Sequence, residues 1–483
     1  MTMVAPPSGD SRPSFRTTAL IIAAALFMEQ LDSTVLATAL PTMARSFQVS
    51  PIHMSAALTS YMLGLAIFIP ASGYFADRFG ARRIFRLAIA VFTVGSILCG
   101  QAQNLPMLVV SRLFQGMGGA MMVPVGRLVL LRSVAAENLV EAMSWFTVPA
   151  LIGPVLGPPV GGFIVTYLSW RWIFYVNVPF GILGIWLATR YIADIRETRV
   201  RAFDLPGFIL SSISLSCIMY GLEMVSRGGG EGWITGAILA VGAVAGVGYF
   251  RHAHTSGHPI LEFRLMKVPS FGISVVSGAL TRITAGAMPF LLPMMMQLGF
   301  GFSAARSGMI TVAGALGSFA MKMVTAPILR RFGFRNILIW NALVATCLIA
   351  LFAAFRPSWP MTAIYAVLLV SGFFQSLQFT ALNTVAYADI PQGRMSSATS
   401  FYATFQQMLL SVGICVSSAL LALSMAIAGH KGPHLSDFTV AFLGVTGISL
   451  FAAPICARLP RNVGSAMTGH REEEMEPALP AEV

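Results

Sequence analysis

Charged side chains are scarce in this sequence of 483 residues, of which Asp, Glu, Lys and Arg together make up only 10%. An average soluble domain carries about 25% of these residues. Hydrophobic residues instead reach 56%, and the mean hydropathy is +0.75. The composition therefore excludes an ordinary water-soluble protein and indicates an integral membrane protein.

Cysteine is rare as well, with five residues in the chain. Each lies singly in or at the edge of an apolar run, at Cys99, Cys217, Cys347, Cys415 and Cys456. This spacing matches neither the clustered ligands of a metal site nor a disulfide framework. We interpret all five as small packing residues, and we expect no metal site.

Motifs that bind nucleotides or carry out hydrolysis are missing. The sequence contains no GxxxxGK[ST] loop, and it also lacks HExxH, GxSxG and CxxC. The absence of a phosphate-binding loop argues against an ATP-driven pump within this chain. Without a recognisable nucleophile or metal cluster, an intramembrane enzyme is disfavoured. We therefore expect no catalytic residues and no cofactor, and any active transport by this chain would take its energy from an ion gradient.

The positive charge does not gather on one face of the chain. The formal net charge is +12, but the arginines are scattered among short loops between apolar runs. A nucleic-acid partner would require a basic patch or stripe. The pattern instead resembles the charge signal that orients membrane helices, so we expect a lipid bilayer and no nucleic acid as the surroundings of this chain.

Fourteen apolar runs are long enough to cross a membrane as helices, since about 20 apolar residues span its hydrocarbon core. A first set of six covers approximately residues 18–40, 52–73, 84–103, 106–130, 139–166 and 171–190. Two further runs follow at 204–225 and 232–250, and a second set of six at 268–296, 304–328, 335–355, 360–388, 395–428 and 437–456. Because the runs are continuously apolar, we exclude a β-barrel, whose strands alternate in polarity.

These runs predict an all-α polytopic fold of two six-helix bundles with two inserted helices. The predicted units are an N-terminal tail 1–17, a first bundle 18–190, a linker with the inserted pair 191–267, a second bundle 268–456 and a C-terminal tail 457–483. The first run carries acids and lacks a convincing cleavage site, so we expect it to be retained as a helix.

Sidedness follows from the Lys and Arg residues. If the N-terminus is cytoplasmic and the chain alternates sides, 22 of the 31 Lys and Arg residues fall in cytoplasmic segments and six on the opposite side. Cytoplasmic loops are enriched in these residues. The count therefore predicts a multi-pass protein of the bacterial inner membrane with both termini in the cytoplasm.

Two of the predicted cytoplasmic hairpins resemble each other. One reads DRFGAR at 77–82, after the second span, and the other reads RRFGFR at 330–335, after the second span of the later set. Their matching positions fit a duplicated six-helix unit. Such repeats are one way to build a transporter with a central binding site.

Ionisable residues at membrane depth are costly and are functional candidates by default. Glu29 and Asp32 are three residues apart on one face of the first span, and Arg112 lies within the fourth. A guanidinium does not readily lose its charge, so we expect Arg112 to pair with one of these acids. We predict that the three residues couple proton binding to transport. The alternatives are a purely structural salt bridge and, for Glu29, a position facing a water-filled vestibule.

Two further segments are predicted to act in conformational change. The fifth span contains Gly153, Pro154, Gly157, Pro158, Gly161 and Gly162. Glycines permit close helix packing and prolines kink the axis, so this helix could pivot against a partner. The hairpin with Gly73, Asp77, Arg78, Gly80, Arg82 and Arg83 could latch a cytoplasmic gate. A tight helix crossing and an orientation loop are the respective alternatives.

Amide, methionine and basic side chains within the spans are the candidates for the lining of a substrate cavity. Amides are expensive when they face lipid, and methionine suits an adaptable cavity. The candidates are Met294, Met295, Gln375, Gln378, Asn383 and Gln406. Arg282 and Lys322 could contact anionic substrates or the coupling network, or snorkel toward an interface.

Four of these motifs together resemble the major facilitator superfamily, specifically its fourteen-helix drug:proton antiporter branch of the EmrB/QacA type. Residues 31–41 are similar to the first-helix signature of that branch, and residues 73–83 to the loop motif of the superfamily. Residues 112–119 and 153–162 are similar to the motifs of the fourth and fifth helices. The resemblance implies alternating access, proton antiport and export of toxic or lipophilic compounds, with Asp32 and Arg112 at matched functional positions.

Two positions depart from that pattern. Ala37 stands where the first-helix signature usually has Asn, and Arg330 stands where the first hairpin has Asp77. We predict a proton-coupled exporter of small organic molecules, including drugs and antibiotics, which acts as a monomer with an accessory periplasmic adaptor as an open possibility. The alternatives are a dedicated exporter of one metabolite or siderophore, an importer, and a non-transporting membrane sensor.

Overall fold

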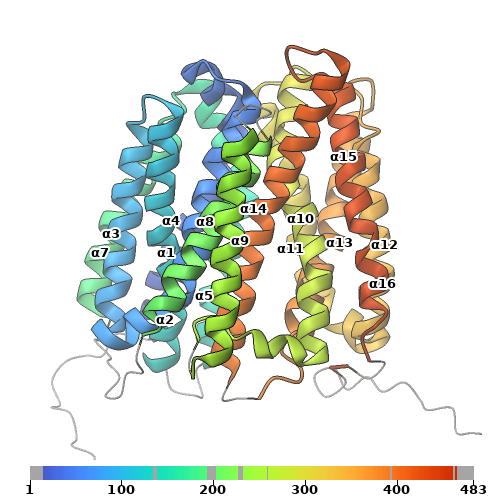
Figure 1. The fold of residues 1–483 in the computed structure, drawn as a ribbon. Coiled ribbons are helices and arrows are strands. Elements are labelled where there is room, and N and C mark those ends of the chain that lie inside the picture. The colour runs from blue at the N-terminus through green and yellow to red at the C-terminus, as the bar shows by residue number, and fades with distance from the viewer. Residues whose placement is uncertain are drawn as a thin grey trace, which may run out of the picture.

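The computed structural model describes residues 15–133, 139–192, 203–226, 232–257, 259–391, 394–460 and 463–464. The secondary structure in these ranges is helical (Figure 1). Helices α1 to α7 form a first half, with the bounds α1 Phe15–Phe47, α2 Ser55–Phe79, α3 Ala81–Gly100, α4 Leu105–Ser133, α5 Leu139–Tyr167, α6 Trp172–Tyr175 and α7 Asn177–Tyr191. The 3-10 turn η1, Pro51–Met54, leads into α2.

The inserted pair consists of α8 Leu205–Ser226 and α9 Gly232–Thr255, followed by the short η3 Phe263–Lys267. The second half comprises α10 Pro269–Met294 with the π-helical turn η4 Met295–Gly299, α11 Ala304–Phe332, α12 Phe334–Phe352, α13 Met361–Val385, α14 Met395–Ala428, α15 Leu435–Leu450 and α16 Ala452–Cys456.

Each of the fourteen predicted spans contains a helix. Thirteen helical stretches of the described residues are long and apolar enough to cross a membrane, and α5 extends over 29 residues as the fourteenth. The described part of α1 starts at Phe15 and so reaches into the predicted tail 1–17. At its other end the helix continues past residue 40, the predicted end of the first span, through Pro41 to Phe47.

The two halves repeat one packing scheme. In the first half, α1 packs along α5, α2 along α4, and α3 along both α4 and α7. In the second half, α10 packs along α14, α11 along α13, and α12 along both α13 and α15. The halves meet through α5 with α11 and through α2 with α14. This repeated packing is what a duplicated six-helix unit predicts.

The two similar hairpins each turn at a glycine with a positive φ. Gly80 ends α2 with a φ of 96°, and Gly333 ends α11 with a φ of 71°. Residues other than glycine rarely adopt such positive φ values. The glycine therefore allows the chain to turn within one residue, so that the next helix begins at once. The short likeness in sequence therefore marks two structurally equivalent turns.

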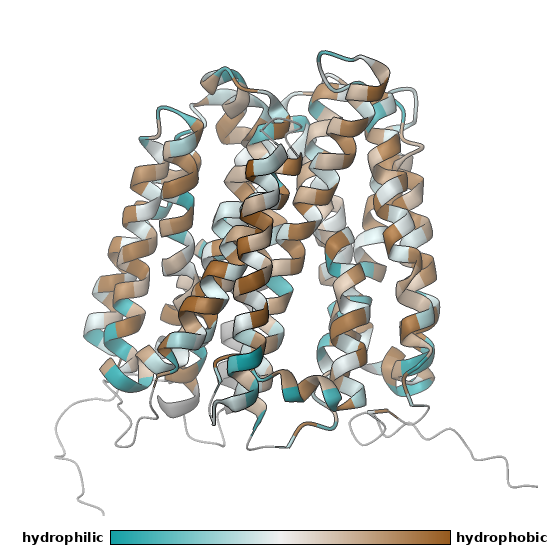
Figure 2. Ribbon diagram, viewed as in Figure 1, coloured by the Kyte–Doolittle hydropathy of each residue, from teal (hydrophilic) through white to brown (hydrophobic). Residues whose placement is uncertain are grey.

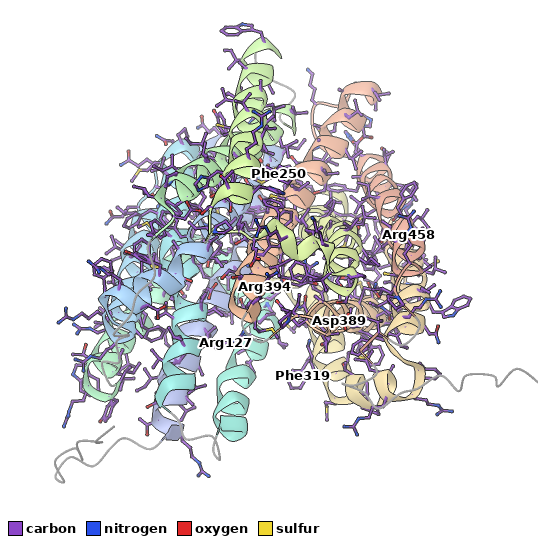
Figure 3. All side chains as sticks on the ribbon, turned by 60° about the horizontal axis from the view of Figure 1, so that its bottom comes forward. Arg127, Phe250, Phe319, Asp389, Arg394 and Arg458 are labelled. Carbon is purple, nitrogen blue, oxygen red and sulfur yellow. The ribbon has the colours of Figure 1, made fainter. Side chains whose placement is uncertain are left out.

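The helices define two faces of the molecule. We call the side on which α1 begins and α16 ends the tail face, at the bottom of Figure 1, and the other side the opposite face. Hydrophobic residues cover the middle of the helices, and hydrophilic residues gather at the ends (Figure 2). Arg127, Asp389, Arg394 and Arg458 lie around the helix ends of the tail face (Figure 3). This distribution fits a protein embedded in a bilayer between its two faces.

The inserted helices α8 and α9 pack against each other, and α8 contacts both halves, through α2 and α14 (Figure 1). On α8, Glu223 is buried, and its carboxylate accepts a hydrogen bond from Ser55 of α2 at 2.7 Å. Cys415 of α14 lies 3.6 Å from the same carboxylate. Sequence reasoning missed Glu223, although an acid inside an apolar run of the inserted pair was a signal for a buried polar contact.

Candidate functional site

Asp32 of α1 and Arg112 of α4 form an ion pair inside the first half. The Arg112 Nη1 atom lies 2.6 Å from Asp32 Oδ2, and the two side chains are 1% and 2% exposed. The guanidinium also donates from Nε to the Ala57 carbonyl at 3.1 Å and stacks over the Tyr61 ring at 4.3 Å. The structure thus brings Arg112 to one of the two acids expected as its partner.

Uncharged polar groups complete the surroundings of the Asp32 carboxylate. Gln115 of α4 and Asn177 of α7 donate to Asp32 Oδ1 at 2.9 and 2.7 Å. Both amides also donate to the Ser96 hydroxyl of α3, at 2.7 and 3.2 Å. The network around Asp32 therefore joins α1 directly to α4 and α7, and through them to α3. Any change in the charge of Asp32 alters its hydrogen bonds to α4 and α7 together.

Asn177 and Ser96 were missed by sequence reasoning, and Gln115 was noted only as part of a motif. The signal for Asn177 was an amide within an apolar run, because amides facing lipid are costly. Serine is too common in membrane helices to carry such a signal. The network could be recognised only once α3, α4 and α7 were placed around α1.

Glu29 lies one turn from Asp32 and is also buried, with 6% of its surface exposed. Its Oε2 atom forms no hydrogen bond of standard geometry among the described residues, although the Tyr61 hydroxyl lies beside it. An ionised carboxylate in such surroundings is costly, and protonation removes that cost. This side chain therefore does not face an open vestibule in the described conformation.

The glycines of the α5 motif set the distance between helices. A Cβ atom on Gly161 would lie 2.6 Å from the Thr38 hydroxyl of α1, and one on Gly153 would lie 2.7 Å from Gln30 Cβ. Gly157 meets Thr34 of α1 still more closely, whereas Gly162 meets the Ala304 carbonyl of α11 in the other half. The motif thus packs α5 tightly against both α1 and α11.

We expect Gly161→Val to lower both transport and stability, because the added atoms would overlap α1. Overpacking of this kind costs about 1–3 kcal/mol of unfolding free energy. Thermal unfolding and uptake into proteoliposomes would measure the two effects. Gly447→Ala in α15 is the control, since a Cβ there meets no atom within 4 Å. Equal behaviour of the two variants would contradict the packing role of the motif.

The predicted gating hairpin contacts the end of α7 and, through Tyr74 and Phe75, the Phe203 ring just before α8. Arg82 donates from Nη1 to the Ile192 carbonyl, just after α7, at 3.2 Å. Gly73, Arg78 and Arg83 are exposed at the tail face, Asp77 is partly buried, and Gly80 forms the turn described above. A latch role for this hairpin stays a prediction.

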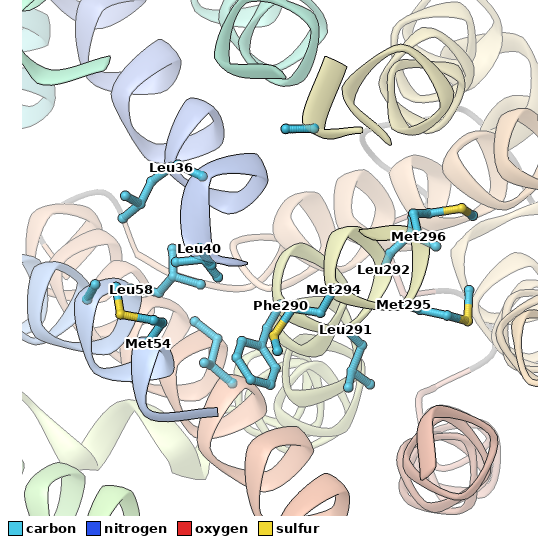
Figure 4. Close-up of a cluster of buried hydrophobic side chains, with 14 of the residues drawn as sticks. Leu36, Leu40, Met54, Leu58, Phe290, Leu291, Leu292, Met294, Met295 and Met296 are labelled. Atoms are coloured by element: carbon cyan, nitrogen blue, oxygen red, sulfur yellow. The ribbon is translucent and has the colours of Figure 1, made fainter. Parts of the chain in front are cut away.

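The two halves are sealed together near the opposite face. Leu36, Leu40 and Leu58 of the first half pack in one cluster with Phe290 and Leu291 of α10 (Figure 4). The cluster contains further buried residues from both halves, including Met54, Leu292, Met294, Met295 and Met296. Gln297 also donates across the interface to the Thr38 carbonyl at 3.0 Å. We call this cluster the outer seal.

A cavity of about 340 Å³ lies between the halves, lined from α1, α5, α10, α11, α12 and α13. Its lining includes Thr34, Thr38, Pro154, Pro158, Met288, Pro289, Thr311, Ala315, Ser318, Ser371 and Gln375. The volume suits a small organic molecule. No lining residue carries a charge, so hydroxyls and one amide supply the polar contacts.

Most of the predicted cavity residues do not line this cavity, and Gln375 alone among those eight candidates does. Met294 and Met295 are buried in the outer seal instead. Gln378 accepts a hydrogen bond from Asn341 at 2.7 Å, which satisfies its amide between α13 and α12. Gln406 is half-buried on α14, outside the lining. An expensive amide can thus be satisfied by a neighbouring helix as well as by a cavity.

The remaining candidates make other contacts. Arg282 donates to the Asn383 side chain at 2.8 Å, and Lys322 donates to the Thr380 hydroxyl at 2.6 Å. Snorkelling is wrong for Arg282, because it is 2% exposed. Separately, His430, His434 and Asp437 at the opposite face have possible metal-binding atoms within 4.8 Å of one another. Asp437 already accepts hydrogen bonds from Ser424 and the His434 backbone, so these contacts explain its position without a metal.

The described architecture has a counterpart among known protein families. The model of the Major Facilitator Superfamily matches residues 22–414 of the sequence. The chain belongs to this superfamily. It is a multi-pass transporter of the bacterial inner membrane, and this confirms the fold class and the family predicted from the motifs.

Relatives of this superfamily member share nearly its whole length. A protein of Pectobacterium atrosepticum named "Putative multidrug resistance protein MdtD" is 36% identical over 442 residues, which cover 91% of this chain and 95% of that protein. Its namesake in Escherichia coli is 35% identical over 444 residues, with 92% and 94% covered. The crystal structure of a D-xylose-proton symporter matches with a TM-score of 0.66 at 14% identity, covering 93% of this chain and 98% of that one. This structural likeness shows the fold alone.

Proposed function

We propose that this transporter exports small organic molecules from the cytoplasm in exchange for protons, by alternating access. The observation that carries the proposal is Asp32, a buried acid held by Arg112, Gln115 and Asn177 within a transporter fold. The names of the relatives from Pectobacterium and Escherichia coli support multidrug compounds as the cargo.

Asp32 can communicate with the cavity through α1. Thr34 and Thr38 of the same helix line the cavity, and α1 packs along the glycine-rich α5. Protonation of Asp32 would remove the charge that Arg112 neutralises and weaken their bond. Rearrangement of α1 against α4 and α7 would then move the cavity wall. A ligand that binds one arrangement better shifts the balance between the two.

The distribution of charge supports a cytoplasmic tail face. The outer seal would then close the periplasmic side, so the described conformation would receive cargo from the cytoplasm. In this mechanism, the hairpin at residues 73–83 closes the cytoplasmic side after the cargo has entered, and periplasmic protons reach Asp32 when the seal opens.

Cells that lack other efflux pumps provide the test of export. Cells that express the transporter should accumulate less of its substrates from a chemically varied panel than cells that do not. The difference should disappear when an uncoupler collapses the proton gradient. A difference that persists without the gradient would argue against proton coupling, and higher accumulation would indicate import.

Gln375 offers a test of the cavity. We expect Gln375→Leu to raise the apparent KM for cargo that carries hydrogen-bonding groups by about three- to tenfold, the value of one hydrogen bond. Apolar cargo should be affected less. Gln406→Leu is the matched control, because this half-buried glutamine lies outside the lining. Equal shifts in the two variants would exclude a specific role for Gln375.

A further inference from the structure

Arg282 is a buried cation in the middle of the second half. It is 2% exposed, and its guanidinium carbon lies 4.5 Å from the centre of the Tyr402 ring. Its Nε atom has no hydrogen-bond partner among the described residues. Because arginine stays charged, this site holds a permanent positive charge at membrane depth.

Lys322 adds a second cation close to the same turn of α13. Lys322 binds Thr380, and Arg282 binds Asn383, one turn further along that helix. Within the described ranges, neither cation has a carboxylate oxygen within 4.0 Å, in contrast to Arg112 and Asp32. Neutral oxygens satisfy part of the hydrogen-bonding capacity of the two cations, but they do not neutralise the charge. A buried charge such as that of Arg282 normally has a counter-ion.

Helical periodicity places these residues on the faces that line the cavity. Lys322 lies one turn beyond Ser318 on α11, and Arg282 lies two turns from Pro289 on α10. Residues separated by about one or two turns share a face of a helix. On α11 the direction from Ser318 to Lys322, and on α10 the direction from Pro289 to Arg282, is toward the tail face. The two cations thus continue the uncharged cavity on its tail-face side.

The complementary ligand is an anion. The cavity lining contains no carboxylate that would attract a cationic compound. The two positive charges lie one and two helical turns beyond the lining residues Ser318 and Pro289, toward the tail face. We propose that Arg282 and Lys322 bind the carboxylate of an organic anion, whose apolar part occupies the cavity above them. The site would give this transporter a preference for anionic cargo. The inference rests on the proposed function only in assigning the cavity to cargo.

Equilibrium binding to the purified, detergent-solubilised transporter can test the charge preference without any gradient. Three probes share one ring system and differ in charge: naphthoate, naphthamide and naphthylmethylammonium. We expect naphthoate to bind at least about tenfold more tightly than naphthamide, because a charged acceptor forms stronger hydrogen bonds with the two cations. Naphthylmethylammonium should bind most weakly.

Variants assign the preference to the two cations. Arg282→Gln should remove most of the difference between naphthoate and naphthamide, and Lys322→Gln should reduce it. Arg306→Gln is the control, because Arg306 stacks on Phe302 near the opposite face. If Arg282→Gln does not fold, the exposed Lys322 still permits the measurement.

Equal binding of the three probes, tighter binding of the cationic probe, or an unchanged preference in both variants would overturn the proposal. Because binding is measured without a gradient, such a result would leave proton-coupled export untouched. Conversely, a failure of proton coupling would leave the charge preference intact.

Discussion

Asp32→Asn is expected to abolish gradient-driven efflux while the protein still folds and inserts. Asparagine has nearly the size of aspartate, and its carbonyl oxygen can still accept a hydrogen bond from Arg112, which keeps its bonds to the Ala57 carbonyl and the Gln115 side chain. The loss of stability should therefore be smaller than in a variant that removes the guanidinium. Asparagine cannot bind and release a proton in the physiological range. Efflux driven by an imposed pH gradient in inverted vesicles should therefore fall to the level of vesicles without the transporter.

A second assay separates coupling from general damage. Exchange of labelled for unlabelled cargo without a gradient requires only alternating access, so it should continue in Asp32→Asn. The matched control is Asp437→Asn, which changes a buried acid at the end of the second half. That variant should retain gradient-driven efflux. Unchanged efflux in Asp32→Asn would rule out Asp32 as the coupling residue.

The helices and their order could be predicted because bilayer thickness imposes a length and a composition on every span. The contact between Asp32 and Arg112 was predictable for an energetic reason, since a permanent cation at membrane depth needs an anion, and few acids were available. The hairpin glycines were recognised for a different reason, which is backbone conformation. Gly80 and Gly333 both have a positive φ, which other residues rarely adopt.

The cavity could not be predicted in the same way. Its wall consists largely of prolines, small residues and hydroxyls, such as Pro158, Ala315 and Ser318, which also occur throughout the other spans. Which face of a helix points to the cavity depends on packing between helices distant in the sequence. Met295 is an example, because it directly follows α10, which lines the cavity, but its side chain is buried in the outer seal.

Arg112→Leu is expected to destabilise the first half more severely than Gly161→Val does. Without the guanidinium, the Asp32 carboxylate loses its counter-ion in a site that is 2% exposed. The side-chain oxygen of Gln115 also loses the donor that lies 2.7 Å away. Breaking a buried ion pair on one side costs about 3–5 kcal/mol of unfolding free energy. We therefore expect a low yield of folded protein and no transport.

A double-mutant cycle distinguishes this mechanism from simple loss of packing. In Asp32→Asn/Arg112→Leu the buried charge is absent from both sides, so much of the lost stability should return while gradient-driven transport stays absent. Non-additive costs are the signature of two groups in direct contact. Arg45→Leu, at an exposed arginine of α1 that bonds Thr42, should cost little. If the double variant is as unstable as the sum of its single changes, then Asp32 and Arg112 do not stabilise each other, and the electrostatic basis of the coupling site fails with them.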